Sequence, residues 1–88
     1  MPVDAIQEQH VHTFDARGVA RRFRHSAIFG AIGVLRSGDT MRFVNDHDPI
    51  PLLAQLRERL GDHLTVTYRQ RDPGAIVIDF GITGVPVE

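Results

Sequence analysis

The segment TMRFVNDHDPIPLLAQLRERLG, residues 40–61, carries the signals of a strand followed directly by a helix. Apolar and polar side chains alternate in residues 40–45, which is typical of a half-buried β-strand. Asp48 can supply an N-cap oxygen, and Pro49 suits the first helical position because that position needs no backbone donor. The leucines that follow recur at helical spacing, and Gly61 is a typical helix stop.

Upstream of this segment, residues 10–15 alternate in the same way and predict the first strand. Apolar residues recur at helical spacing after Ser26, so we expect Ser26 to cap a helix that ends near Gly38. Residues 21–25 then form a loop between this strand and this helix, and the loop is rich in arginine.

Downstream, residues 64–69 and 76–82 alternate again and are joined by a turn at residues 71–74. The predicted order is strand-helix-strand-helix-strand-strand. It indicates an α+β fold, a two-layer α/β sandwich in which a four-stranded mixed sheet carries both helices on one face. We expect one domain over residues 10–88, preceded by a flexible tail at residues 1–9.

Composition excludes several classes of function. The chain has 88 residues, a formal net charge of −1 and no cysteine. Without a thiol it cannot form a disulfide, a thiolate metal site, a persulfide or a cysteine nucleophile. No stretch resembles a signal peptide or approaches the ~20 apolar residues that span a bilayer, so we expect a cytoplasmic protein without a membrane partner. The net charge and the few aromatic residues argue against nucleic acid as a partner.

Chain geometry predicts where a site would lie. A strand-helix-strand unit is almost always a right-handed crossover, so the first two strands run parallel and both helices begin at the same sheet edge. That places residues 21–25 beside residues 45–48, next to two helix N-termini whose backbone N–H groups favour anions. The candidate ligand-binding residues are Arg21, Arg22, Arg24, His25, Asp46 and His47.

Three kinds of chemistry suit these residues. His25, His47 and Asp46 carry imidazole and carboxylate groups that ligate a transition metal or haem iron. The arginines at a helix N-terminus suit a small anion. An enzyme would use His47 or His25 as general base on an anionic substrate. Because no nucleophile is paired with a base, we expect a binding module rather than an enzyme and assign no catalytic residue.

Each of these residues also has a structural interpretation. Two histidines without ligand spacing can be ordinary loop residues, and an arginine-rich loop can simply be solvated. Asp48 is assigned to the N-cap, and His10, His12 and His63 are expected away from this edge. A third alternative is a protein-interaction surface, including a homodimer, on the open sheet face, which carries Thr65, Thr67, Arg69, Val77 and Asp79.

Several short motifs resemble those of the TusA-like (SirA-like) sulfur-carrier superfamily. Residues 14–18 are similar to its LD-x-R-G opening, residues 37–39 to its P-G-E, and residues 45–49 to its D-D-P-type segment. The resemblance covers about residues 13–82 and implies the TusA-like fold. Sulfur transfer does not carry over, because residues 21–24 read RRFR where the family has its C-P-x-P segment.

A cysteine-free, uncharacterised bacterial branch of that superfamily resembles the chain more closely. Residues 24–29 match its R-H-x-x-I-F helix start, and residues 45–52 match its N-D-H-D-P-x-P-L segment. Members often occur beside hemerythrin-like domains or near nitrogen-oxide and respiratory genes, so the resemblance implies a redox or hemerythrin-like protein partner. The chain departs from the branch in its final hairpin, where tryptophans are common and this chain has Tyr68 as the aromatic residue.

Overall fold

The structure is a computed structural model that describes residues 10–84, so the tail predicted for residues 1–9 lies outside the described residues. Within the described part of the chain, no helix is long and apolar enough to cross a membrane. The elements in chain order are β1 (Val11–Asp15), η1 (Ala16–Gly18), α2 (Arg21–Gly33), β2 (Thr40–Asn45), α3 (Ile50–Leu60), η2 (Gly61–His63), β3 (Leu64–Asp72) and β4 (Ala75–Ile82).

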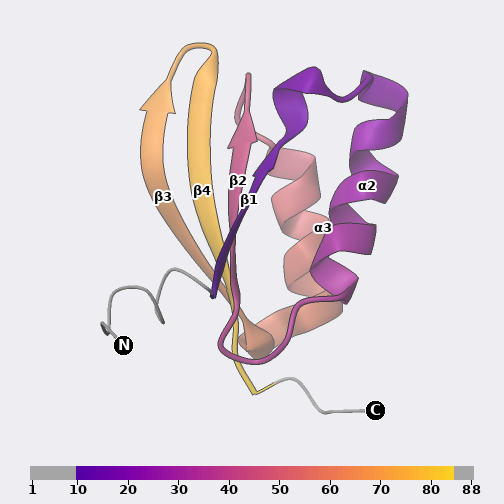
Figure 1. The fold of residues 1–88 in the computed structure, drawn as a ribbon, viewed down its shortest axis with the longest axis vertical. Helices are drawn as coiled ribbons and strands as arrows, with labels where there is room; N and C mark the ends of the chain where they lie inside the picture. Colours follow the sequence, from indigo (N-terminus) through magenta and orange to yellow (C-terminus); the bar gives the residue numbers. More distant parts are fainter. Residues whose placement is uncertain (1–9, 85–88) are drawn as a thin grey trace.

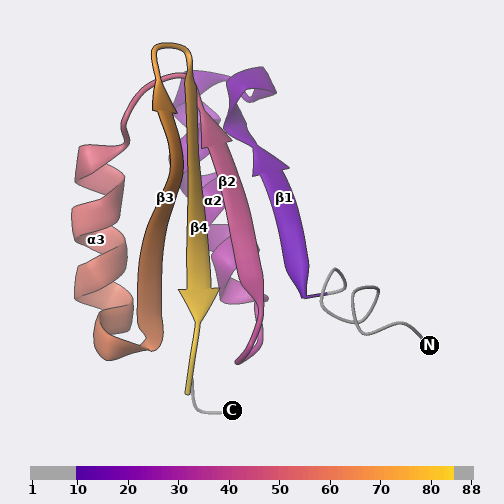
Figure 2. The ribbon, with the colours of Figure 1, turned by 90° about the vertical axis from the view of Figure 1, so that its left-hand side faces the viewer.

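The strands form one four-stranded sheet in the order β1-β2-β4-β3. β1 runs parallel to β2, and β4 runs antiparallel to both of its neighbours. Both helices pack on the same face of the sheet and begin at the same end of the molecule (Figures 1 and 2). The predicted α+β fold with a mixed sheet and two helices is confirmed.

The core lies between the sheet and the helices and follows the alternation of the strands. Phe43 of β2 and Phe80 of β4 are completely buried, and their rings lie 5.7 Å apart. Each apolar side chain buried in this way stabilises the fold by roughly 1.5–3 kcal/mol. The buried positions are Ala16, Ile28, Ile32, Met41, Phe43, Leu52, Leu53, Leu56, Ile76, Ile78, Phe80 and Ile82.

The start of α2 differs from the prediction. The helix begins at Arg21 rather than at Ser26, so the predicted arginine loop is the first turn of the helix, and Ser26 is an exposed helical residue. The N-cap residue is Ala20, which has no side chain that can cap. The first turn is held instead by the side chain of Arg24, whose Nε donates to Val19 O at 2.8 Å.

The end of α2 also differs from the prediction. The helix stops at Gly33, five residues before Gly38. Gly38 has a φ of +94° and forms the tight turn before β2, where its N–H donates to Ile82 O at 2.7 Å. The positive φ explains why glycine occupies this position, because other residues adopt it only with strain. The glycine signal therefore marked a turn between elements, not a helix cap.

Candidate functional site

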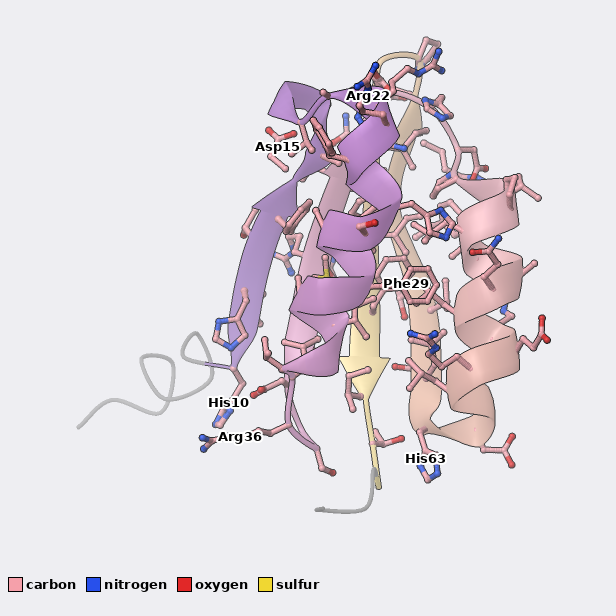
Figure 3. The ribbon with its side chains drawn as sticks, turned by 90° about the vertical axis from the view of Figure 1, so that its right-hand side faces the viewer. His10, Asp15, Arg22, Phe29, Arg36 and His63 are labelled. Atoms are coloured by element: carbon pink, nitrogen blue, oxygen red, sulfur yellow. The ribbon has the colours of Figure 1, made fainter. Side chains whose placement is uncertain are left out.

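The predicted sheet edge contains a hollow between the first turns of the two helices. Its volume is about 200 Å³. Figure 3 shows this end of the molecule near Arg22. We call it the α2–α3 hollow; its lining residues are Arg21, Arg24, His25, Ile28, Phe43, Asn45, His47, Pro49, Pro51 and Leu52. The structure thus brings four of the six candidate residues, Arg21, Arg24, His25 and His47, around one space.

Arg24 positions the two segments that meet at this hollow. Its Nη1 donates to Asp46 Oδ1 at 3.1 Å and to Asn45 Oδ1 at 3.3 Å, while its Nε holds Val19 O. The side chain is only 14% exposed. Because its donors are directed at protein acceptors, Arg24 joins the start of α2 to the end of β2 rather than offering a free charge.

Asn45 supports the same junction and was not predicted as a site residue. It is 3% exposed, and its Nδ2 donates to His47 O at 3.0 Å while its Oδ1 accepts from Arg24. A buried polar side chain persists only when it is hydrogen-bonded. The available signal was its register: Asn45 follows Met41 and Phe43 on the buried face of β2, where an apolar residue is expected.

Asp46 and His47 form a pair on the rim. His47 Nδ1 lies 2.6 Å from Asp46 Oδ1. The hydrogen bond from His47, followed by that from Arg24, lowers the pKa of Asp46, so the carboxylate is ionised at neutral pH. An ionised acceptor fixes Nδ1 of His47 as the donor, which leaves Nε2 as the acceptor nitrogen of a neutral ring.

His25 lies on the rim of the same hollow but is occupied by stacking. Its ring lies 4.9 Å from the ring of Phe29, and the Arg59 guanidinium covers the same phenylalanine at 4.8 Å. Within residues 10–84, no group of three or more histidine, aspartate or glutamate side chains is placed to hold a metal ion. The predicted set of His25, His47 and Asp46 does not form such a group among these residues.

Arg21 and Arg22 supply the unpaired positive charge of this edge. Both are exposed, and neither forms a hydrogen bond or ion pair with another residue in the described part of the chain. The first turn of α2 contains no acidic residue and has no side-chain cap. The positive end of the helix dipole therefore adds to the arginine charge.

α3 contributes less to this edge than predicted, because Asp48 does not cap it. The N-cap residue is Pro49, and no side-chain cap bond forms. The Asp48 carboxylate instead accepts from Tyr68 Oη at 2.5 Å and from Arg71 Nη2 at 3.0 Å. Ile50 N is already bonded to Asp48 O, and prolines 49 and 51 carry no N–H, so α3 has few free donors.

Asp48, Tyr68 and Arg71 form a second cluster that was not predicted. The Arg71 guanidinium lies 4.1 Å from the centre of the Tyr68 ring. The hydroxyl of Tyr68 is the main cause of a lowered pKa for Asp48, while burial and the nearby carboxylate raise the pKa of Tyr68. The cluster fastens the β3–β4 hairpin to the start of α3.

The open sheet face is polar at its centre. Arg42 binds both carboxylate oxygens of Asp79, at 2.9 and 3.1 Å, and Arg69 lies 3.8 Å from the same group. An apolar interaction face would lack such a charged centre. The geometry therefore gives less support to the open face than to the helix-start edge.

A search of curated proteins and a search of solved structures gave no match. A protein-family model described as "Uncharacterized conserved protein (DUF2249)" matches residues 13–81, which include all four strands in part or whole, both helices and the α2–α3 hollow. The chain therefore belongs to the DUF2249 family of uncharacterised conserved proteins.

Proposed function

We propose that this domain is a non-catalytic binding module that takes a small anion, an oxyanion or a carboxylate, in the α2–α3 hollow. The observation that carries the proposal is the charge balance at the edge. Asp46 is already paired with Arg24 and hydrogen-bonded to His47, so Arg21 and the start of α2 determine the sign of the field in the hollow. An arginine beside free helix N–H groups is a general arrangement for anion binding.

The size and walls of the hollow support a small ligand. About 200 Å³ is less than the roughly 300–1,000 Å³ of pockets that enclose drug-sized molecules, which argues against haem. Ile28, Phe43 and Leu52 form apolar walls. An apolar wall lowers the local dielectric constant and strengthens the attraction between a guanidinium and an anion.

A second candidate function, catalysis on an anionic substrate, is favoured by the His47–Asp46 pair. The carboxylate orients the imidazole through Nδ1 and leaves Nε2 as a base. The same arrangement serves acid–base catalysis by a histidine that is hydrogen-bonded to a carboxylate. Arg21 would then bind the substrate anion. The pair lacks an adjacent nucleophile in the described residues, so a base-assisted reaction of the bound molecule or of water is the form this alternative takes.

The TusA-like relationship and a redox partner are part of the same proposal. The β-α-β-α-β-β order is compatible with a TusA-like relationship, and the absence of cysteine means that the domain's own residues cannot carry sulfur as a persulfide. A redox or hemerythrin-like partner in the cytoplasm is supported by the sequence motifs alone.

Amide NMR titration of the purified domain tests the anion proposal. We expect saturable shifts at residues 21–25 and 45–48 with phosphate, nitrite or acetate, and Arg21→Gln should weaken binding by about tenfold because a charge-assisted contact is lost. The matched control is Arg57→Gln, an exposed arginine on α3 that does not line the hollow.

The same titration includes Zn²⁺ and hemin as competing ligands. Saturable shifts at His25 and His47 with either of them, but with no anion, would replace the anion proposal with a metal or haem site. Turnover of an anionic ester that disappears in His47→Gln would replace it with the enzyme alternative.

A further inference from the structure

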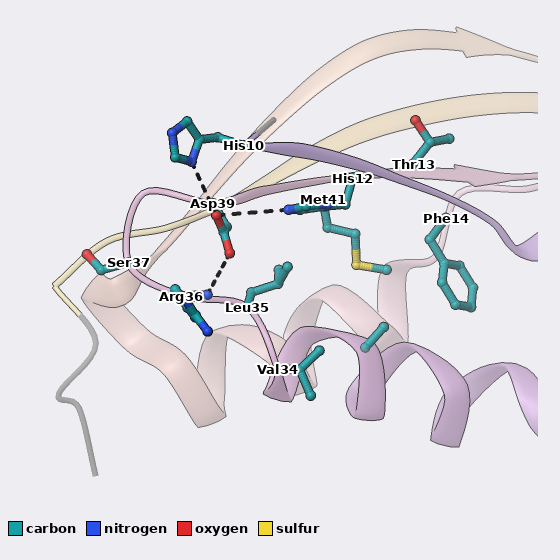
Figure 4. A pocket seen from close by; sticks show the side chains of 11 residues that line it. His10, His12, Thr13, Phe14, Val34, Leu35, Arg36, Ser37, Asp39 and Met41 are labelled. Atoms are coloured by element: carbon teal, nitrogen blue, oxygen red, sulfur yellow. Dashed lines mark hydrogen bonds and ion pairs between the residues drawn. The ribbon is translucent and has the colours of Figure 1, made fainter. Parts of the chain in front are cut away.

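A hollow larger than the proposed anion site lies at the opposite end of α2. Its volume is about 640 Å³, within the range of pockets that enclose drug-sized molecules. Figure 4 shows it from close by, and we call it the β1–α2 hollow. Its lining residues are His10, His12, Thr13, Phe14, Ala31, Val34, Leu35, Arg36, Ser37, Asp39 and Met41.

The hollow exists because the helical layer ends early beneath an edge strand. α2 stops at Gly33, and the chain then leaves the helix axis toward the turn at Gly38. β1 is the outermost strand of the sheet. The floor under β1 is apolar and includes Phe14, Leu35 and Met41. Val34 is 78% exposed on the wall, so apolar surface remains open to a ligand.

The polar groups of the hollow gather at one carboxylate. Asp39 Oδ2 accepts from Arg36 N at 2.8 Å. Asp39 Oδ1 lies 3.6 Å from His10 Nδ1 and 4.0 Å from His12 Nε2, and both distances exceed the roughly 2.7–3.2 Å of a hydrogen bond. The Asp39 side chain is only 15% exposed. Oδ1 is therefore a largely buried acceptor without a close hydrogen bond from either histidine, and it can accept one from a ligand.

The negative charge of the β1–α2 hollow comes from the Asp39 carboxylate, since no other acidic residue lines the hollow in the described part of the chain. The hydrogen bond from Arg36 N lowers the pKa of Asp39, so the carboxylate is ionised at neutral pH. α2 ends here without a basic residue in its last turn, so the negative end of its dipole is uncompensated by the helix itself. Arg36 lines the hollow as well and is the lining residue with a permanent positive charge.

We propose that the β1–α2 hollow is a second binding site, for an apolar or aromatic amine whose ammonium group donates to Asp39 Oδ1 and whose apolar part covers Phe14, Leu35 and Met41. His10 and His12 flank the ammonium with ring nitrogens, and each can accept a hydrogen bond in the neutral form. The site is separate from the α2–α3 hollow, so either proposal can fail without the other.

A matched series of probes tests the site: 2-phenylethylamine, the neutral 2-phenylethanol and the anionic 3-phenylpropionate. We expect saturable amide shifts at residues 34–41, with the amine bound about tenfold more tightly than the alcohol and the acid bound least. Asp39→Asn should abolish the preference for the amine over the alcohol. Arg36→Gln should tighten amine binding, because it removes the competing positive charge.

Asp62→Asn is the matched control, since Asp62 is exposed and does not line the hollow. Circular dichroism and the amide spectrum of Asp39→Asn show whether the turn has survived. If that variant unfolds, Arg36→Gln and the filling variant Ala31→Phe, which should weaken all three probes, decide the question. Equal affinity for the three probes, or saturable Zn²⁺ shifts at His10 and His12 without amine binding, would overturn the proposal.

Discussion

Asn45 shows how much one buried polar side chain contributes at this edge. It joins Arg24 of α2 to the backbone of the loop after β2. Asn45→Ala would leave the His47 carbonyl and one Arg24 donor without a partner, so we expect the free energy of unfolding to fall by about 1–3 kcal/mol. Urea unfolding measures this, with Gln55→Ala as an exposed amide control that should change little. A loss equal to that of the control would show that Asn45 is dispensable.

Removal of one oxygen atom, the Tyr68 hydroxyl, tests the cluster of Asp48, Tyr68 and Arg71. Tyr68→Phe removes the hydroxyl that donates to Asp48 and keeps the ring under Arg71. We expect the pKa of Asp48 to rise toward its ordinary value, because the main cause of its depression is lost. Stability at neutral pH should fall by about 1 kcal/mol. Carboxyl NMR titration of Asp48 checks the first result, and an unchanged pKa would mean that Arg71 alone holds the carboxylate.

At the scale of elements, periodicity predicted most of the fold. Alternation located the strands, and leucine spacing located α3, whose end at Gly61 is confirmed with a φ of +54°. These signals succeed because the buried face of an element has a fixed repeat. The beginnings of the helices were wrong. At α2 no side chain caps the helix, and Arg24 binds the carbonyl of Val19 before its first turn; at α3 the Asp48 carboxylate accepts from Tyr68 and Arg71 instead of capping the helix.

The proximity of residues 21–25 and 45–48 was predicted, whereas the contacts between their side chains were not. The crossover rule placed residues 21–25 beside residues 45–48 because it depends on topology alone. Which charges remain free depends on partners distant in sequence, such as Asn45 for Arg24. The β1–α2 hollow was not predicted, because a hollow formed by the end of one helix beneath an edge strand leaves no residue pattern in the chain.

Alanine substitutions at two glycines, one in a helix and one in a strand, should change stability in opposite directions. A Cβ at Gly30 in α2 would meet no atom within 4 Å. Gly30→Ala should therefore stabilise the protein by about 0.5–1 kcal/mol through helix propensity. A Cβ at Gly81 in β4 would lie 2.3 Å from Thr65 Oγ1. Gly81→Ala should therefore destabilise the protein by about 1–3 kcal/mol.

A double-mutant cycle identifies the cause at Gly81. Thr65→Ala removes the oxygen that the new methyl group would meet, so the double variant Gly81→Ala, Thr65→Ala should recover part of the lost stability. Thermal or urea unfolding of the four proteins in the cycle gives the coupling. Strict additivity of the two single changes would show that the clash at Thr65 is not the cause.

For the whole molecule, the aspartates determine the response to acid. The pKa of Asp15 is lowered to about 2, chiefly by the hydrogen bond from Arg17, and those of Asp39, Asp46 and Asp48 are also lowered. A carboxyl whose pKa is lower when folded adds stability above its unfolded pKa, near 4, and loses it as pH falls through the folded pKa. We expect the melting temperature to decline from about pH 4 downward. A melting temperature that rises on acidification would contradict this.

The position of β1 at the edge of the sheet also determines how the molecule opens. β1 pairs with β2 alone among the described strands, and its five residues are the fewest of any strand, whereas β4 is paired on both sides. In native-state hydrogen exchange, β1 amides should therefore exchange through a local opening while β4 amides await global unfolding. Detachment of β1 removes one wall of the β1–α2 hollow. A molecule bound there would oppose the detachment of β1. The resulting decrease in the exchange rate of the β1 amides would report its affinity without a label.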